Sequence, residues 1–248
     1  MDLWAFYRAP AGARVPFPKL LPARLEGRPN RFLIVARSAG RQLRAACRDP
    51  GRLTAILRPG AELRLAPAPG ERRVTRHDLV LARHRGRWVC LIPALANDVL
   101  ARALEAGGLP GLEGARVRAR EVRRGHSRFD FLLDLEGRPA LVEVKSVAWR
   151  RDGVGCFPDA PTRRGRRHVE DLIERRRQGG AAAIVFVAQR GDVEAVTPAA
   201  DVDPEFARAL LSATRAGVAL RAYGCQVDTR GCRIARRLPL LLPGTPLP

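Results

Sequence analysis

Two patterns of apolar and polar residues divide the chain. Between Arg31 and Pro93, short apolar runs such as "RFLIVAR", "AELRLAP" and "RWVCLIP" alternate with Gly, Pro and Asp-Pro-Gly. This pattern predicts a series of short strands, and several such strands within about 65 residues are typical of a small barrel or sandwich. The preceding residues 1–24 are Pro-rich and aperiodic, so we expect an extended lead-in there.

The second half has longer elements. Apolar residues recur at helical spacing in "PALANDVLARALEAGG", and the glycines at its end predict a stop. Two strands are expected at 128–135 and 140–149, followed by a helix at 167–178, a strand at 181–189, a helix at 203–217 and a strand at 218–225. A hairpin followed by alternating helices and buried strands predicts a three-layer α/β domain. We therefore expect one domain over 25–92 and a second over 93–248.

Net charge suggests a partner. The chain has 45 basic and 25 acidic residues, a formal charge of +20, which favours binding to a polyanion such as nucleic acid. An Arg-rich surface that is merely solvated is the alternative. No apolar run of 18 residues, basic amphipathic helix or lipidation motif indicates a membrane, and the N-terminal residues lack a secretion-signal pattern, so a cytoplasmic location is expected.

Several kinds of site are not indicated. The five cysteines are scattered and form no C-x-x-C pair, which argues against a disulfide framework or a structural zinc. There is no Walker A or dinucleotide-binding fingerprint, so no nucleotide cofactor is expected.

Charged residues interrupt two of the predicted strands. Strand alternation places Asp130 opposite the face shared by Phe129 and Phe131, and it places Glu143 and Lys145 together on one face of the next strand. Because paired strands lie about 4.8 Å apart, a hairpin lets Asp130 and Glu143 converge on one divalent metal.

A metal held there would have an oxygen-rich environment. The two carboxylates, a backbone carbonyl such as that of Val144, and waters suit Mg²⁺ or Mn²⁺. Lys145 is one of only two lysines beside 43 arginines. Burial can lower the pKa of a lysine, so Lys145 could position or deprotonate a water, or neutralise charge on a phosphate, whereas arginine could not act as a base. A buried Glu143–Lys145 ion pair, or ordinary charges on an exposed edge strand, is the alternative.

The residues around these charges resemble a known family. The run "EVRRGHSRFDFLLDLEGRPALVEVKSVAW" together with "FPDAPTRRGRRH" closely resembles the sugar fermentation stimulation protein A family, whose C-terminal half is similar to the PD-(D/E)XK nuclease core. In the first half, "RPNRFL" and "DPGRLTAILRPGAEL" resemble the family's OB-type barrel. The resemblance implies a mixed α/β protein: an OB-type barrel followed by a three-layer PD-(D/E)XK nuclease-like domain.

The resemblance also assigns catalytic residues. It implies that Asp130, Glu143 and Lys145 form the nuclease triad, joined by an upstream acid, Glu121. The Pro-Asp element is matched only loosely, since Arg128 and Phe129 precede Asp130.

Binding residues are expected on both halves. The family motifs contain Ser127, Arg128, Thr162, Arg164, Gly165 and His168, to which we assign nucleic-acid binding; Thr162 is also a candidate helix cap. On the barrel, Arg31 and Arg52 are candidates for backbone contacts, while Phe32 is expected in the core, so binding there would rest on charge more than on stacking.

The sequence thus predicts Mg²⁺- or Mn²⁺-dependent hydrolysis of nucleic acid, with DNA favoured over RNA. Members of the family are described both as DNA-binding proteins linked to sugar-utilisation genes and as metal-dependent nucleases. A non-catalytic DNA-binding regulator of sugar (maltose-type) fermentation genes is therefore the alternative, and a protein that merely coats RNA is a third. The sequence leaves a homodimer open.

Overall fold

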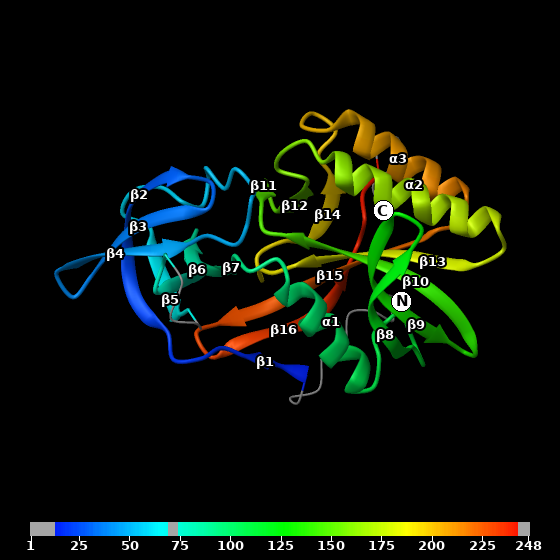
Figure 1. The fold of residues 1–248 in the computed structure, drawn as a ribbon, viewed down its shortest axis with the longest axis horizontal. Coiled ribbons are helices and arrows are strands. Elements are labelled where there is room, and N and C mark those ends of the chain that lie inside the picture. The colour runs from blue at the N-terminus through cyan, green and yellow to red at the C-terminus, as the bar shows by residue number, and fades with distance from the viewer. Residues whose placement is uncertain (1–12, 69–73, 243–248) are drawn as a thin grey trace.

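The first half of the chain forms a closed five-stranded barrel in the computed structural model, which describes residues 13–68 and 74–242 (Figure 1). Its neighbouring strands follow the order β4-β3-β2-β5-β6, and a parallel pairing of β4 with β6 closes the barrel. β7 (Arg87–Cys90) continues beyond β6. The predicted barrel is confirmed, with strands β2 (Leu21–Asn30), β3 (Leu33–Ser38), β4 (Arg41–Ala46), β5 (Glu62–Pro67) and β6 (His77–His84).

The predicted lead-in contains strands that the sequence pattern did not indicate. β2 begins at Leu21 and pairs with both β3 and β5, although it contains Pro22 and Pro29. Register shifts on either side of Gly27 bend this strand, and bulges are where sheets tolerate residues that cannot donate to the ladder. β1 (Val15–Pro16) pairs with the last strand of the second domain, and residues 1–12 of the predicted lead-in lie outside the described residues.

Over the described residues, the second half is built on a seven-stranded mixed sheet with the order β1-β16-β15-β13-β10-β9-β8. β10 and β13 pair in parallel, as do β13 and β15, while the remaining neighbours are antiparallel. β13 reads "AAAIVFVA" because helices cover both of its faces. The other strands are β8 (Arg116–Arg124), β9 (Ser127–Leu135), β10 (Arg138–Val147), β13 (Ala181–Ala188), β15 (Ala219–Asp228) and β16 (Gly231–Leu238).

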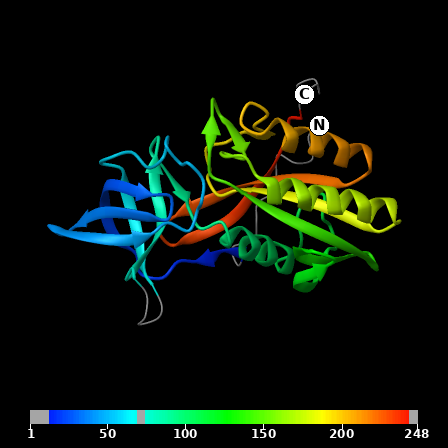
Figure 2. The same cartoon turned by 45° about the horizontal axis from the view of Figure 1, so that its top comes forward.

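Helices cover this sheet on both sides (Figure 2). α1 (Leu95–Glu105) packs Val99 and Leu100 into one cluster, whereas α2 (Arg163–Arg177) and α3 (Pro204–Arg215) pack Leu172 and Phe206 into the cluster on the opposite face. The three-layer prediction is therefore confirmed. A small sheet of β11 (Arg150–Arg151), β12 (Val154–Phe157) and β14 (Ala195–Pro198) lies beside these layers.

The arginine-rich segment that follows Thr162 belongs to the first turns of α2. The predicted Thr162 cap is confirmed, because Thr162 Oγ1 accepts a hydrogen bond from the backbone N–H of Gly165 at 3.0 Å. The helix consequently begins at Arg163, four residues before the predicted start, so Arg163 to Arg167 lie on a helical turn.

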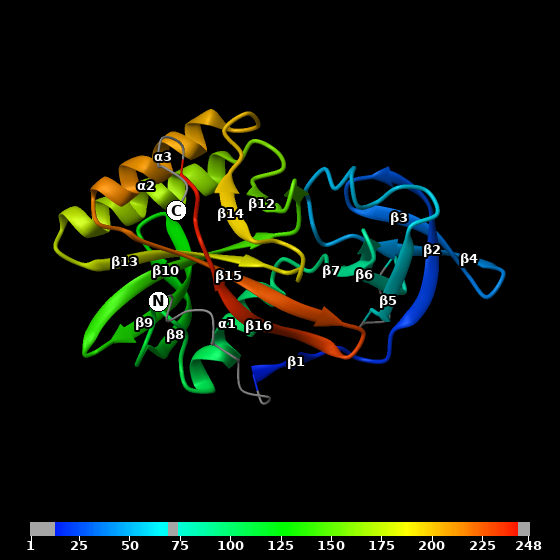
Figure 3. The same ribbon diagram turned by 180° about the vertical axis from the view of Figure 1, so that it is seen from behind.

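The two domains meet at one end of the sheet (Figure 3). Buried polar contacts hold them together there. Arg190 is fully buried, and its guanidinium donates to both carboxylate oxygens of Asp192 at 2.7 and 2.9 Å and to the carbonyl of Ala148 at 2.6 Å. Its Nη2 also lies 3.0 Å from Nδ1 of His84 on the barrel. The backbone carbonyl of the adjacent Gln189 accepts a hydrogen bond from the N–H of Cys90 in β7. Unpairing a buried charge is costly, so this cluster fixes the domains relative to each other.

Helix length and polarity bear on membrane crossing. Within 13–68 and 74–242, no helix is long and apolar enough to cross a membrane.

Candidate functional site

The candidate site lies where β9 separates from β10. Their antiparallel pairing runs from Leu135–Arg138 to Phe131–Val142 and is not continued by the next pair of residues. At this split, Asp130 Oδ2 accepts a hydrogen bond from the backbone N–H of Val144 at 2.7 Å, so its carboxylate bridges the diverging strands. The other oxygen, Oδ1, accepts from Asn97 Nδ2 at 2.7 Å.

The strand separation corrects one prediction. Phe129 does not share a face with Phe131: it packs in the α2 and α3 cluster, with its ring 5.7 Å from that of His168, whereas Phe131 packs in the α1 cluster. Strict alternation assigns faces only while a strand stays paired on both edges, and the pairing of β9 with β10 does not extend from Phe131 to Phe129.

Glu143 is the buried centre of the site. Its Oε1 accepts from Lys145 Nζ at 2.7 Å and lies 2.5 Å from His168 Nδ1, while its Oε2 is buried and has no hydrogen-bond partner in the structure. All three side chains are less than one-tenth exposed. The buried Glu143–Lys145 ion pair considered from the sequence is present, but it leaves one carboxylate oxygen unsatisfied.

The two carboxylates respond differently to burial. Burial raises the pKa of Asp130, and the neighbouring charge of Glu143 raises it further against the hydrogen bonds from Val144 and Asn97. Burial acts in the same direction on Glu143, but the hydrogen bonds and charges of His168 and Lys145 outweigh it and lower the pKa of Glu143. Negative charge at Asp130 is therefore incompletely compensated.

These features fit a divalent cation. In the described part of the chain, no three His, Cys, Asp or Glu side chains form a ready ligand group, so a cation would depend on Asp130 and Glu143 with backbone and water oxygens. The unsatisfied Oε2 of Glu143 and the raised pKa of Asp130 are both features that a bound cation would relieve. An oxygen-dominated donor set is the kind that Mg²⁺, Mn²⁺ and Ca²⁺ prefer. The carbonyl of Val144 as a further ligand stays a prediction.

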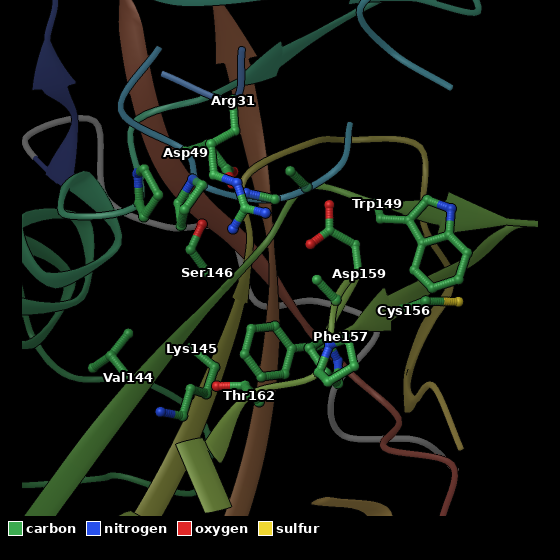
Figure 4. Close-up of a pocket in the computed structure, with 17 residues that line it drawn as sticks. Arg31, Asp49, Val144, Lys145, Ser146, Trp149, Cys156, Phe157, Asp159 and Thr162 are labelled. Atoms are coloured by element: carbon green, nitrogen blue, oxygen red, sulfur yellow. The ribbon is translucent and has the colours of Figure 1, made fainter. Parts of the chain in front are cut away.

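A pocket of about 280 Å³ opens beside the triad, between the two domains (Figure 4). Arg31 and Asp49 line it from the barrel, and Lys145, Trp149 and Thr162 line it from the second domain. The guanidinium of Arg31 reaches into the pocket from the barrel side. Residues of both halves therefore face one space that Lys145 also lines.

Arg28 organises the barrel side of this pocket. Its Nη2 donates to the carbonyls of Arg31 and Gly51, both at 2.8 Å, and its Nη1 contacts the carbonyl of Arg52. One side chain thereby joins the β2–β3 turn to the loop that precedes Leu53. Arg28 was not among the predicted site residues, although it is the first residue of the segment "RPNRFL".

Asp159 joins the same loop to the second domain. Its Oδ2 accepts from the N–H of Leu53 at 3.2 Å, and a side chain at Gly51 would collide with its carboxylate. The motif segments around Gly51 and Asp159 thus meet in space. Sequence order carried no signal for this contact, because 106 positions separate Leu53 from Asp159.

Some predicted binding residues are accessible and others are not. Arg31, Arg52 and Arg164 are exposed, and Thr162 lines the pocket. Three others are buried and act within the protein, which is at odds with their predicted contact with nucleic acid: Ser127 donates to the carboxylate of Asp171, Gly165 fits under the Thr162 side chain, and His168 holds Glu143.

His168 has a defined orientation. Its Nε2 faces Nε of Arg164 at 3.5 Å, and since arginine can only donate, Nδ1 is the nitrogen that donates to Glu143. His168 is therefore a positioning residue for the Glu143 carboxylate.

Glu121 stands apart from the triad in its contacts. It occupies an irregular position in β8 with φ of +56°, and its half-exposed carboxylate pairs with Arg128 Nε at 2.8 Å. The side chain that contacts Asp130 is instead Asn97 of α1, which the sequence analysis did not single out. A catalytic role for Glu121 stays a prediction.

Comparison with known proteins identifies the family. A model described as "Sugar fermentation stimulation protein RE domain" matches residues 94–231, and one described as "SfsA N-terminal OB domain" matches residues 27–91. The chain belongs to the sugar fermentation stimulation protein (SfsA) family. Its second domain is of the restriction-endonuclease-like (RE) type, as the resemblance implied.

Individual relatives agree with this assignment. The sugar fermentation stimulation protein homologue of Moorella thermoacetica is 47% identical over 212 residues, covering 84% of this chain and 91% of the relative. That of Chloroflexus aurantiacus is 41% identical over 233 residues, covering 94% and 89%. The structure of Pyrococcus furiosus SfsA in complex with Ca²⁺ matches with a TM-score of 0.86 and 30% identity, over 95% of this chain and 100% of that one.

Proposed function

We propose that this SfsA homologue is a divalent-metal-dependent nuclease that hydrolyses phosphodiester bonds at the Asp130, Glu143 and Lys145 site. The observation that carries the proposal is the buried Oε2 of Glu143, which has no hydrogen-bond partner and belongs to a carboxylate beside Asp130 and Lys145. The RE-type domain and the Ca²⁺ complex of the Pyrococcus furiosus relative support a cation there. The formal charge of +20 supports a polyanionic substrate.

The protein's own residues suit this chemistry. Asp130 and Glu143 would hold Mg²⁺ or Mn²⁺, which when bound would polarise the phosphate and make a water more acidic. Asn97 and the Val144 N–H fix the Asp130 carboxylate, so it is oriented before any ligand arrives. Lys145 lines the pocket, and its ammonium is held by Glu143. From there it can orient the attacking water and stabilise charge that develops on the phosphate.

Cleavage assays test the proposal. Labelled single- and double-stranded DNA and RNA would be incubated with Mg²⁺, Mn²⁺ or EDTA, using the wild type beside Glu143→Ala and Lys145→Ala. We expect metal-dependent products that both substitutions abolish, while Lys145→Ala leaves binding largely intact. Lys19→Ala is the matched control, because Lys19 is the other lysine and is exposed. Cleavage by Lys145→Ala at the wild-type rate would contradict the assignment.

The second candidate is a non-catalytic DNA-binding regulator of sugar fermentation genes. The buried Glu143–Lys145 pair favours it, since each group partly neutralises the other without any reaction. Both candidates predict binding that weakens steeply with salt, so metal-dependent turnover is what separates them. The preference for DNA over RNA, the cytoplasmic location and a homodimer stay predictions from the sequence.

A further inference from the structure

We propose that the strand bound at this site is unpaired, with one base stacked on Phe32 of the barrel and an adjacent phosphate held by Arg31 at the mouth of the interdomain pocket. The inference deepens the proposed function and rests on it for the position of the scissile bond. The exposure of Phe32 contradicts the expectation from the sequence that this residue belongs to the core.

The exposure of Phe32 is the first observation. Phe32 is 59% exposed, and among the described residues the only other exposed large hydrophobic residue is Val74. Two hydrogen bonds fix its backbone: its N–H donates to Asn30 Oδ1 at 2.9 Å, and its carbonyl accepts from the N–H of Cys47 at 2.9 Å. The ring is therefore presented to solvent by an ordered turn, and a rigid exposed ring is what stacking on a base requires.

The position of this turn is the second observation. Arg31, the residue before Phe32, reaches into the pocket that Lys145 also lines. Arg28 holds the turn against the loop at Gly51, so the distance between the ring and the site is set by the fold. A strand stacked on Phe32 can therefore continue past Arg31 toward Lys145.

The far wall of the pocket has matching chemistry. Trp149 lines it, and the guanidinium carbon of Arg151 lies 4.8 Å from the centroid of its ring. The carboxylates of Asp49 and Asp159, which also line the pocket, accept hydrogen bonds from backbone N–H groups of the barrel loop. Arg151 covers the Trp149 ring, so this wall contributes positive charge rather than a second ring for stacking.

A duplex would use this arrangement poorly. Its bases are paired and stacked inside, so it would offer Phe32 only sugar and phosphate unless a base were extruded. The other large ring of the barrel, Trp88, is covered by Arg64 and Arg83, whose guanidinium carbons lie 4.6 and 5.3 Å from its centroid. Of the two large rings of the barrel, Phe32 is therefore the one that remains open to a base.

Binding measured without cleavage tests the inference. Fluorescence anisotropy in EDTA would compare a labelled 12-nucleotide single-stranded DNA, the RNA of the same sequence, and the DNA duplex. We expect the wild type to prefer the single strands, Phe32→Ala to bind them about tenfold more weakly, and Phe32→Trp to retain binding. A 2-aminopurine base in the strand should be quenched by the wild type and by Phe32→Trp, but less by Phe32→Ala.

Matched controls separate stacking from general effects. Val74→Ala removes the other exposed apolar side chain and should bind like the wild type. Arg31→Ala should weaken binding and reduce its salt dependence. Arg41→Ala should change it less, because Arg41 begins β4 and pairs with Ser38, at the end of β3 away from Arg31. A thermal melt of each variant verifies that it is folded.

The outcomes are distinct for the two proposals. Wild-type affinity and quenching in folded Phe32→Ala, or tighter binding of the wild type to the duplex than to either single strand, would overturn the inference. Absence of cleavage with every metal would overturn the nuclease proposal alone, since the binding measurements need no cleavage.

Discussion

Asp49, a carboxylate of the interdomain pocket, is predicted to destabilise the folded protein at neutral pH. Burial raises the pKa of Asp49 from 3.8 to about 6, and the nearby charge of Asp159 adds to this, against the hydrogen bond from the Gly51 N–H and the charge of Arg28. Between pH 3.8 and about 6 the folded state therefore holds a proton that the unfolded chain has lost. The free energy of unfolding consequently falls as pH rises through this window.

The size of the effect follows from the pKa. At about 1.36 kcal/mol for each unit of pKa, the rise of the Asp49 pKa from 3.8 to about 6 lowers the free energy of unfolding by about 3 kcal/mol. This loss is complete above pH 6 and small below pH 4. Asp49→Asn removes the charge, and its amide oxygen can still accept from the N–H of Gly51, at present 2.9 Å from Asp49 Oδ1. We expect Asp49→Asn to be more stable than the wild type by up to about 3 kcal/mol at pH 7.5 and by about 1 kcal/mol at pH 4.5.

Urea unfolding of both proteins at the two pH values measures this difference. Asp201→Asn is a useful control, because a hydrogen bond from Arg151 lowers the pKa of exposed Asp201, so its substitution should not stabilise the protein. The reasoning fails if Asp49→Asn is no more stable than the wild type at pH 7.5, or if its advantage is equal at both pH values.

Three further predictions concern the helix cap, the domain contact and the cation. Gly165→Ala would place a Cβ 2.7 Å from Thr162 Oγ1, so we expect loss of the cap and a decrease of about 1 kcal/mol in the free energy of unfolding, measured with urea. Arg190→Ala leaves the buried contacts of Asp192 without their partner and should cost about 3–5 kcal/mol; a change below about 1 kcal/mol would refute the role assigned to it. Mn²⁺ at about 100 times its Kd should stabilise the wild type by about 2.7 kcal/mol in a thermal melt, and Asp130→Asn should lose most of this gain.

Local patterns predicted the elements whose environment is simple. The uninterrupted apolar run at Ala181–Ala188 indicated a strand buried on both faces, and helical spacing from Leu95 indicated α1. The charged residues in the apolar strands gave the candidate site, because few functions other than chemistry or pairing require a buried Glu143 and Lys145. These inferences need only the chain around each residue.

Features that depend on distant residues were missed. β2 was hidden by Pro22 and Pro29, which are compatible with a strand only because register shifts bend it. Asn97 could not be assigned to the site, since its hydrogen bond to Asp130 requires α1 to lie against the diverging strands. Phe32 was placed in the core because an apolar residue beside a strand usually packs inward, and nothing local reveals that it occupies the turn.

The environment of Lys145 accounts for lysine in a chain that otherwise relies on arginine. Lys145 is buried, and its Nζ has one hydrogen-bond partner among the described residues, Oε1 of Glu143. A guanidinium at this position would bring five N–H donors in a fixed plane to the same buried carboxylate, which already contacts His168, and the donors left over would be unsatisfied. Lysine is thus favoured by donor number, because its ammonium serves the one partner that Glu143 offers.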